Sequence, residues 1–463
     1  MSAARGTVLR LERAASRVLS RRARALLRPL RRRPPGVELD GWDGPLVAGR
    51  TTAPFPAPPP VPAPVLAPVP AAAPAPGTSG ERRRCLLVTH SLETGGVDEV
   101  VSHLARSLPA HGFDVAVLVA SDDEPQGIGQ LGRRLLDDGV EVVDAAGADG
   151  ARWIEGWRPD VVYLHGDVRW PVRVARRLGV PAVLALHGMH DLFALDGGAV
   201  LERSRDLAAV VAVSELVREE YLAKSGGLDA AAVHVIPNGV HPDKVSAVGH
   251  DACRASLGLE DETLFVSLAR HNMQKNTYAL VEAFEDVARA LPRAHLLVCG
   301  RADEAVYSRQ VVARRDRSPA ADRIHLRDNL WRVDAVLAAA DVFVLDSYFE
   351  GWALSSMEAL AAGTPVVLSD VGGAREQVGG PVANGVVVGH PLGRPVGLTW
   401  DEMEYARFRR QPNREEVVDA MVAVARGDYA ASRAEIAADA ARRFSPARSV
   451  RAHADLLRRV VAG

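Results

Sequence analysis

The stretch that decides the fold is "DVFVLDSYFEGWALSSMEALAAGTPVVLS", residues 341–369. It begins with a continuous apolar run, passes through a polar loop into a segment with helical character, and ends in a second apolar run. Continuous apolar runs of this length are typical of parallel strands buried on both faces. A helix between two such runs predicts a strand-helix-strand unit of an α/β protein.

Two series of apolar runs extend this pattern over most of the chain. The first series is "CLLVTH", "DVAVLVA", "VEVV", "DVVYLH", "AVLALH", "AVVAVS" and "VHVIP". The second is "TLFVSLA", "AHLLVCG", "RIHL", "DVFVLD", "TPVVLS" and "GVVV". A length of 463 residues also exceeds the usual size of one hydrophobic core. We therefore predict two doubly wound, Rossmann-like α/β domains that face each other across a cleft.

The domain boundaries follow from shifts in composition. The N-terminal domain is predicted over residues 84–245 and the C-terminal domain over residues 255–440, with a hinge in the polar region between them that is rich in Gly and Pro. Residues 441–463 are expected to form a helix that packs back toward the N-terminal domain. Residues 34–80 are rich in Pro and Ala and are expected to be an extended linker.

The first 33 residues are strongly basic, with eleven arginines and a single glutamate. Two interpretations stay open: an amphipathic helix on an anionic membrane surface, and a disordered basic tail. A transit peptide and a nucleic-acid-binding arm rank below both. The head is expected to be an appendage, because the linker separates it from both domains.

The whole chain gives no reason to expect a nucleic-acid partner, because Lys+Arg (56) nearly balances Asp+Glu (58). Three cysteines without a CxxC pair indicate neither a disulfide framework nor a zinc cluster, so the expected compartment is the cytoplasm. Prolines interrupt the longest weakly polar stretch, residues 53–76, which excludes a membrane-spanning helix there.

Glu350 and Glu358 lie eight positions apart around the predicted start of a helix. Ser355 precedes Glu358 by three residues and predicts a capping box. Glu350 comes earlier, at the carboxyl end of a predicted strand, where doubly wound sheets bind ligands. The free amides of a helix N-terminus suit a phosphate. Two carboxylates around a diphosphate, one at each hydroxyl-rich end, indicate a nucleotide-sugar site.

The interval from Glu350 to Glu358 has the E-x7-E form of the family 4 glycosyltransferases, which are retaining enzymes of the GT-B fold. Four further stretches resemble that family in the same order, and the similarity covers roughly residues 84–460. They are "TGGVDEVVSHLARSL", "VIPNGV", "SLARHNMQKN" and "MEALAAGTPVVLSDVGGAREQV". Each motif is weak alone, whereas five in register form a specific signal.

The resemblance implies a metal-independent, hexosyltransferase-like enzyme whose donor is a nucleotide-diphosphate sugar. Arg270 and Lys275 resemble the family's diphosphate clamp, where fixed cations stabilise the leaving group. Gly95 and Gly96 would let backbone amides approach the diphosphate from the facing domain. No metal and no cofactor are expected, because these cations and the helix terminus neutralise the charge.

The same resemblance implies contacts to the two ends of the donor. His187 matches the position that contacts the donor sugar, Glu350 would bind sugar hydroxyls, and Glu358 would bind the ribose hydroxyls. The loop and helix start between the glutamates would complete the donor site with Gly351, Leu354 and Ser355.

The predicted function is transfer of a sugar to a glycan, lipid or small-molecule acceptor, as in polysaccharide biosynthesis, by a cytoplasmic protein peripheral at the inner face of the plasma membrane. Two alternatives stay open: an epimerase or phosphorylase on the same fold, and a non-catalytic membrane-associated module that binds nucleotide sugars. Three departures from the family pattern, Ala353, Asn276 and "GGVDE", leave the donor's identity open.

Overall fold

The computed structural model describes residues 46–47, 50, 82–93, 95–122, 124–125, 127–188, 190–193, 195–240, 244–245, 249–328, 332–429 and 431–463. The predicted head, residues 1–33, lies outside the described residues. The predicted linker, residues 34–80, also lies outside them except for residues 46, 47 and 50. Within the part that the structure describes, no helix is both long and apolar enough to cross a bilayer.

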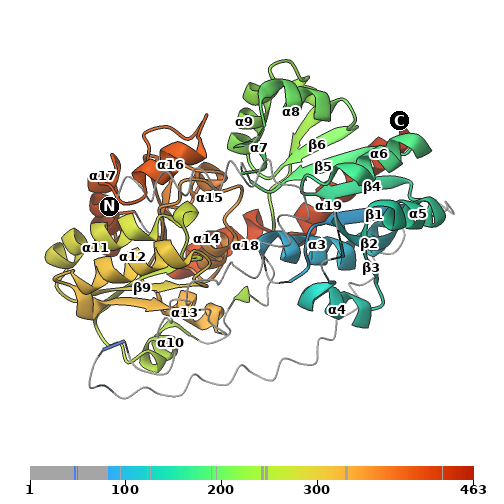
Figure 1. Cartoon of the computed structure of the whole chain (residues 1–463). Helices are drawn as coiled ribbons and strands as arrows, with labels where there is room; N and C mark the ends of the chain where they lie inside the picture. Colours follow the sequence, from blue (N-terminus) through green and yellow to red (C-terminus); the bar gives the residue numbers. More distant parts are fainter. Residues whose placement is uncertain are drawn as a thin grey trace.

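The N-terminal domain is built on a parallel seven-stranded sheet with the order β3-β2-β1-β4-β5-β6-β7 (Figure 1). Its strands are β1 (Arg83–Thr89), β2 (Phe113–Ser121), β3 (Glu141–Ala146), β4 (Val161–His165), β5 (Ala182–Leu186), β6 (Ala209–Ala212) and β7 (Val233–Val235). Its helices are α3 (Gly96–Ser107), α4 (Gly129–Asp137), α5 (Gly147–Trp157), α6 (Arg169–Leu178), α7 (His190–Phe193), α8 (Gly197–Ser204) and α9 (Glu215–Ser225).

The C-terminal domain repeats this architecture with a parallel six-stranded sheet of order β10-β9-β8-β11-β12-β13. Its strands are β8 (Thr263–Leu268), β9 (Ala294–Cys299), β10 (Ile324–Arg327), β11 (Val342–Leu345), β12 (Val366–Ser369) and β13 (Gly385–Val388). Its helices are α10 (His250–Ser256), α11 (Thr277–Ala290), α12 (Ala305–Asp316), α13 (Val333–Ala339), α14 (Leu354–Ala361), α15 (Ala374–Val378), α16 (Trp400–Ala406), α17 (Arg414–Ala425) and α18 (Arg433–Arg443). The two sheets confirm the predicted fold of two doubly wound domains.

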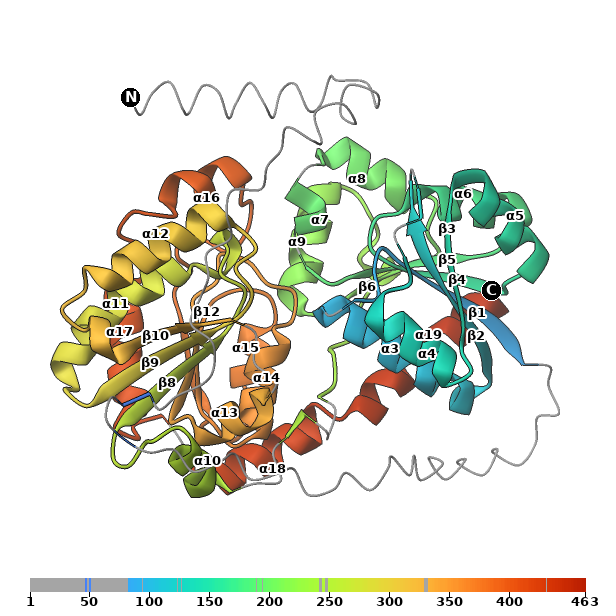
Figure 2. The same ribbon diagram turned by 60° about the horizontal axis from the view of Figure 1, so that its bottom comes forward.

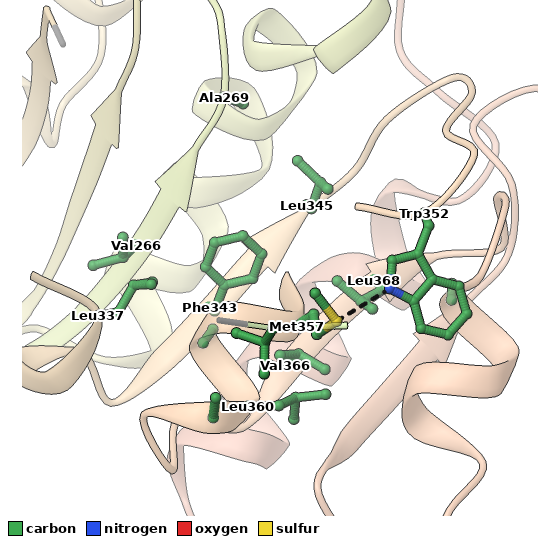
Figure 3. Close-up of a cluster of buried hydrophobic side chains, with 14 of the residues drawn as sticks. Val266, Ala269, Leu337, Phe343, Leu345, Trp352, Met357, Leu360, Val366 and Leu368 are labelled. Atoms are coloured by element: carbon green, nitrogen blue, oxygen red, sulfur yellow. Dashed lines mark hydrogen bonds between the residues drawn. The ribbon is translucent and has the colours of Figure 1, made fainter. Parts of the chain in front are cut away.

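The stretch quoted at the outset forms β11, α14 and β12. Its apolar side chains interlock beneath the helix, where Phe343 of β11 faces Met357 and Leu360 of α14 (Figure 3). Burial of a side chain such as Phe343, which is 0% exposed, contributes about 1.5–3 kcal/mol. The Trp352 indole N–H also donates to the Met357 sulfur at 3.3 Å. This packing fixes α14, and with it the position of its N-terminus.

Two segments pack on the domain that lies farther from them in the sequence. After α18, helix α19 (Pro446–Ala462) leaves the C-terminal domain and packs on the N-terminal domain, where Val450 and Leu457 join the core with β1 and β4 (Figure 2). At the other end, Leu46 is buried against the C-terminal domain and its amide donates to the Leu257 carbonyl at 2.9 Å. Arg50 pairs with the buried Glu262 at 2.8 Å.

Candidate active site

A cavity of about 560 Å³ lies between the two domains, within the usual range for a small-molecule site. Its walls come from residues at or just after the carboxyl ends of strands in both sheets, as expected for doubly wound domains. The N-terminal domain contributes Gly95, Gly96, His187 and Gly188, and the C-terminal domain contributes Arg270, Lys275, Glu350, Gly351, Leu354 and Ser355. The structure therefore brings nine of the ten predicted site residues to one cavity.

The two predicted cations of this cavity each pair with a carboxylate. The Lys275 Nζ donates to Glu350 Oε1 at 2.6 Å, and the Ser347 hydroxyl donates to the same oxygen at 2.7 Å. Arg270 pairs instead with Asp303 at 3.0 Å and is half exposed. Within the described residues, no group of three or more His, Cys, Asp or Glu side chains is arranged to hold a metal ion. Among the described residues that line this cavity, Arg270 and Lys275 are the arginine and lysine side chains.

Lys275 is held by an unusual backbone conformation at the next residue. Asn276 has φ 52° and ψ 29°, in the left-handed region that favours Gly and tolerates Asn. Its side chain donates to Asp346 at 3.0 Å, and Asn413 donates to the other Asp346 oxygen at 2.8 Å. Burial raises the pKa of Asp346 to about 7, and the two amide bonds oppose that rise. This buried network fixes the turn that carries Lys275.

The N-terminus of α14 faces the cavity without a side-chain cap from the described residues. The helix begins at Leu354 with Ala353 as its N-cap, so the predicted capping box of Ser355 with Glu358 is wrong. The helix thus starts two residues earlier than a Ser355 cap would place it, and the Ser356 hydroxyl and the Gln377 side-chain amide donate to the Ala353 carbonyl. The amides of an uncapped helix start and its positive dipole end suit an anionic group.

Glu358 lies apart from the other predicted site residues. It lines a neighbouring cavity of about 540 Å³ between α3, α4, α14 and α19. The two cavities share Asn238 and Leu354 in their walls. Glu358 therefore lines a cavity that adjoins the one lined by Lys275 and Glu350.

His187 follows β5 and lines the cavity beside the other domain. Its Nε2 lies 2.8 Å from Nδ1 of His165, which ends the neighbouring strand β4, so one of these nitrogens donates to the other. Burial, and after it the neighbouring His187 and His453, hold the pKa of His165 well below its ordinary value. A neutral His165 can fix the tautomer and the ring orientation of His187.

Comparison with known proteins identifies the family of this chain. The model described as "Glycosyl transferases group 1" matches residues 250–391, and the model described as "Glycosyltransferase Family 4" matches residues 94–244. A D-inositol 3-phosphate glycosyltransferase of Xylanimonas cellulosilytica is 31% identical over 68% of this chain and 86% of its own length. The chain belongs to the family 4 glycosyltransferases.

Two further similarities place this glycosyltransferase among its relatives. The D-inositol 3-phosphate glycosyltransferase of Segniliparus rotundus is 30% identical over 47% of this chain, and the match spans only about half of that relative, 53%. The solved structure of Anabaena HepE in complex with UDP-glucose superimposes with a TM-score of 0.59 at 17% identity, covering 81% of this chain and all of that one. The structural match shows the shared fold.

Several cavity residues of the glycosyltransferase were missed from the sequence. His165, which contacts His187 and does not itself line the cavity, carried a usable signal, because it ends an apolar run as His187 does. Trp400 carried none, because it lies outside the apolar runs and the motifs. The other missed wall residues include His190, Asn238, Asn272, Gln274, Glu304 and Phe349.

Proposed function

We propose that this glycosyltransferase moves a hexose from a nucleoside diphosphate sugar to a glycan, lipid or small-molecule acceptor, with retention of configuration and without a metal ion. One observation carries the proposal. Arg270, Lys275 and the uncapped start of α14 lie around a single cavity between the two domains. This is the set of groups that a diphosphate leaving group requires.

The chemistry of the leaving group sets the roles of the cations. Negative charge grows on the diphosphate as its bond to the sugar breaks, and preorganised donors in a water-poor site stabilise that charge. Arg270 supplies a planar fork of donors, and Lys275 supplies a point charge. The α14 amides and the backbone at Gly96 add dipoles from opposite domains. In this proposal these groups take the place of a metal ion.

The carboxylates and His187 then select the rest of the donor. Glu350, held by Lys275 and Ser347, can accept hydrogen bonds from two adjacent sugar hydroxyls. His187 contacts the sugar from the other domain, in an orientation set by His165. Glu358 binds the ribose from the neighbouring cavity, which shares Asn238 and Leu354 with the first. Closure of the domains excludes water that would otherwise hydrolyse the donor.

The similar proteins give this proposal its substrate classes. HepE was solved with UDP-glucose, which supports a uridine donor for this chain. The curated relatives are named for an inositol phosphate acceptor, which supports a polyhydroxylated ring as the acceptor. A donor and an acceptor of these classes would also suit a role in polysaccharide biosynthesis.

Two rival functions would leave the same cavity intact. An epimerase would convert the nucleotide sugar without an acceptor, and a phosphorylase would transfer the sugar to inorganic phosphate, so analysis of products with and without acceptor and phosphate separates these reactions. A non-catalytic module would bind the donor without turnover.

The Arg270→Ala variant tests the proposal. We expect it to slow turnover by raising the activation free energy about 2–4 kcal/mol, roughly the contribution of one charge partner in the transition state. Turnover is measured as release of UDP from UDP-glucose in the presence of a panel of acceptors. The matched control is Arg289→Ala on α11, where the arginine is 71% exposed and pairs with Asp286. Equal turnover by both variants would remove Arg270 from the site.

We also propose a cytoplasmic location with peripheral attachment at the inner face of the plasma membrane. This proposal rests on the eleven arginines of residues 1–33, each of which contributes about 1 kcal/mol near an anionic surface. The test is co-sedimentation with phosphatidylserine vesicles. It compares vesicle binding of the full chain with that of a chain starting at residue 34.

A further inference from the structure

Trp400 is a large aromatic side chain on the wall of the cleft with much of its surface exposed. It begins α16 and lines the same cavity as Glu350 and His187. The side chain is 40% exposed, whereas Phe349 beside it is 2% exposed. An exposed indole on the wall of a polar cavity is a surface to which an apolar face of a ligand can bind.

The indole is held in place by aromatic rings from both domains. Phe193 of α7 meets Trp400 edge to face at 5.5 Å between ring centroids, and Phe349 meets it at 5.6 Å. Phe193 and Phe349 also meet each other at 4.9 Å. Because Phe193 belongs to the N-terminal domain, this cluster assembles only when the domains come together.

The backbone that carries Trp400 is anchored as well. Thr399 and Glu402 form a capping box at the start of α16, and Met403 on the next turn is fully buried. Just before the helix, the Gly397 amide donates to Glu220 of the N-terminal domain at 3.2 Å. These contacts therefore fix the orientation of the indole while the two domains are in contact.

Three contacts join the domains, and the elements that make the first and the last, α3 with α14 and α7 with α16, lie at opposite ends of the region between the domains (Figures 1 and 2). At one end, Gly96 lies against Leu354 at the start of α14. In the middle, His187 lies against Gly351. At the far end, Phe193 lies against Trp400. If the diphosphate binds at the first contact and the transferred sugar at the second, as under the proposed function, then Trp400 lies beyond the sugar.

We propose that Trp400 is the stacking platform for the ring of the acceptor, a pyranose or cyclitol whose C–H face packs on the indole. This inference rests on the proposed function and adds a residue that selects the acceptor. Packing of the ring against Trp400 would place an acceptor hydroxyl toward the sugar held by Glu350 and His187. The aromatic contact from Phe193 restricts this binding to the closed domains.

Trp400 lies outside the residues that the two family models match. The C-terminal family model ends at residue 391, before the segment that forms α16. A residue in such a segment can select the acceptor, because binding residues often lie on segments that a rigid scaffold positions.

The test compares Trp400→Ala with Tyr405→Ala. Tyr405 is 68% exposed on the same helix, does not line the cavity, and stacks on Arg409. With UDP-glucose as donor and a panel of pyranosides and cyclitols as acceptors, we expect Trp400→Ala to raise the acceptor KM on the order of tenfold. Trp400→Phe keeps a flat ring and should restore most of the loss, and Tyr405→Ala should leave the acceptor KM unchanged.

Calorimetry with UDP-glucose separates the two proposals. An unchanged donor Kd in Trp400→Ala, together with the raised acceptor KM, supports acceptor stacking. A weakened donor Kd with an unchanged acceptor KM would show that the indole stacks on the donor sugar and would overturn the inference. Wild-type protein that transfers only to acceptors without a ring would also overturn it. Wild-type protein that binds no nucleotide sugar would contradict the proposed function itself.

Discussion

Asp346 shows how one buried residue can support the site without lining it. The carboxylate is 4% exposed and accepts hydrogen bonds from the side chains of Asn276 and Asn413. The Oδ1 atoms of these two asparagines are buried without a hydrogen-bond partner among the described residues. An Asn at position 346 can therefore accept from one asparagine and donate to the Oδ1 of the other after that one side chain rotates.

The raised pKa of Asp346 predicts a pH dependence of stability. Its pKa rises from 3.8 to about 7 on folding, so the folded chain binds this proton more tightly than the unfolded chain does. Stability from this group is complete below about pH 4 and falls as the pH rises toward 7. We expect Asp346→Asn to narrow the drop in melting temperature between pH 5 and pH 8. The control is Asp322→Asn, whose carboxylate is 83% exposed; the same narrowing in both would contradict the assignment.

Asn276 shows what the sequence could predict at this scale and what it could not. The family resemblance marked it as a departure, because Gly is common after the lysine. The left-handed conformation explains why Gly suits the position and why Asn is tolerated. The partner of the side chain was not predictable, because Asp346 lies 70 residues away and only the fold brings them together.

At the scale of elements, α18 is joined to two other helices by a single side chain. The Arg433 guanidinium donates to the Ala338 and Ala340 carbonyls at the end of α13 and to the Ala362 carbonyl just after α14, at 2.8–3.2 Å. Gly363 makes the approach possible, because a Cβ there would lie 2.4 Å from the Arg433 carbonyl oxygen. Arg433 thus satisfies carbonyl groups that helix ends leave unpaired.

We expect Arg433→Met to lower the free energy of unfolding by about 3 kcal/mol, because buried carbonyls lose their donor. Arg442→Met on the same helix is the control. That arginine is 64% exposed and pairs with Asp439, so its loss should cost about 0.5 kcal/mol or less. Urea unfolding monitored by circular dichroism measures both variants. Similar midpoints for the two would show that α18 does not depend on Arg433.

The strands were predictable from the sequence, and one helix start was not. Every apolar run became a strand, because a parallel strand buried on both faces needs an unbroken apolar run. The capping box predicted at Ser355 is wrong because α14 already begins at Leu354, so that Ser355 lies inside the helix and not at its N-cap. The same pattern does form capping boxes at Thr399 and Ser432, where the flanking backbone is free to adopt it.

At the scale of the whole molecule, Gly351 sets how closely the domains approach. A Cβ on this residue would lie 2.0 Å from the His187 carbonyl oxygen and 2.9 Å from the Gly188 amide nitrogen, both in the other domain. Backbone atoms cannot move aside as a flexible side chain can. The closed cleft therefore requires Gly at this position.

We expect Gly351→Ala to hold the domains apart and to reduce turnover on the order of 100-fold, the usual effect of a misplacement of about 1 Å. Small-angle X-ray scattering with UDP-glucose present should give a larger radius of gyration than for the wild type. Gly156→Ala on α5 is the control, because a Cβ there meets nothing within 4 Å. A Gly351→Ala variant with the wild-type radius and turnover would contradict this role.

Long-range contacts were beyond the reach of the sequence. The pairing of Arg50 with Glu262 joins residues 212 positions apart, from a region that read only as linker. Trp400 lines the cleft and contacts Phe193, which belongs to the other domain. Such contacts depend on how the two domains meet, whereas strand patterns depend on each domain alone.

The crossing of α19 onto the N-terminal domain has a consequence for protein synthesis. Val450 and Leu457 complete a core whose sheet strands end at β7, roughly 200 residues earlier, which a ribosome adds in about 10–40 s. During that interval the nascent N-terminal half waits with an apolar face uncovered. The domain that is translated first is thus the last to be finished, and a chaperone that shields it has tens of seconds in which to act.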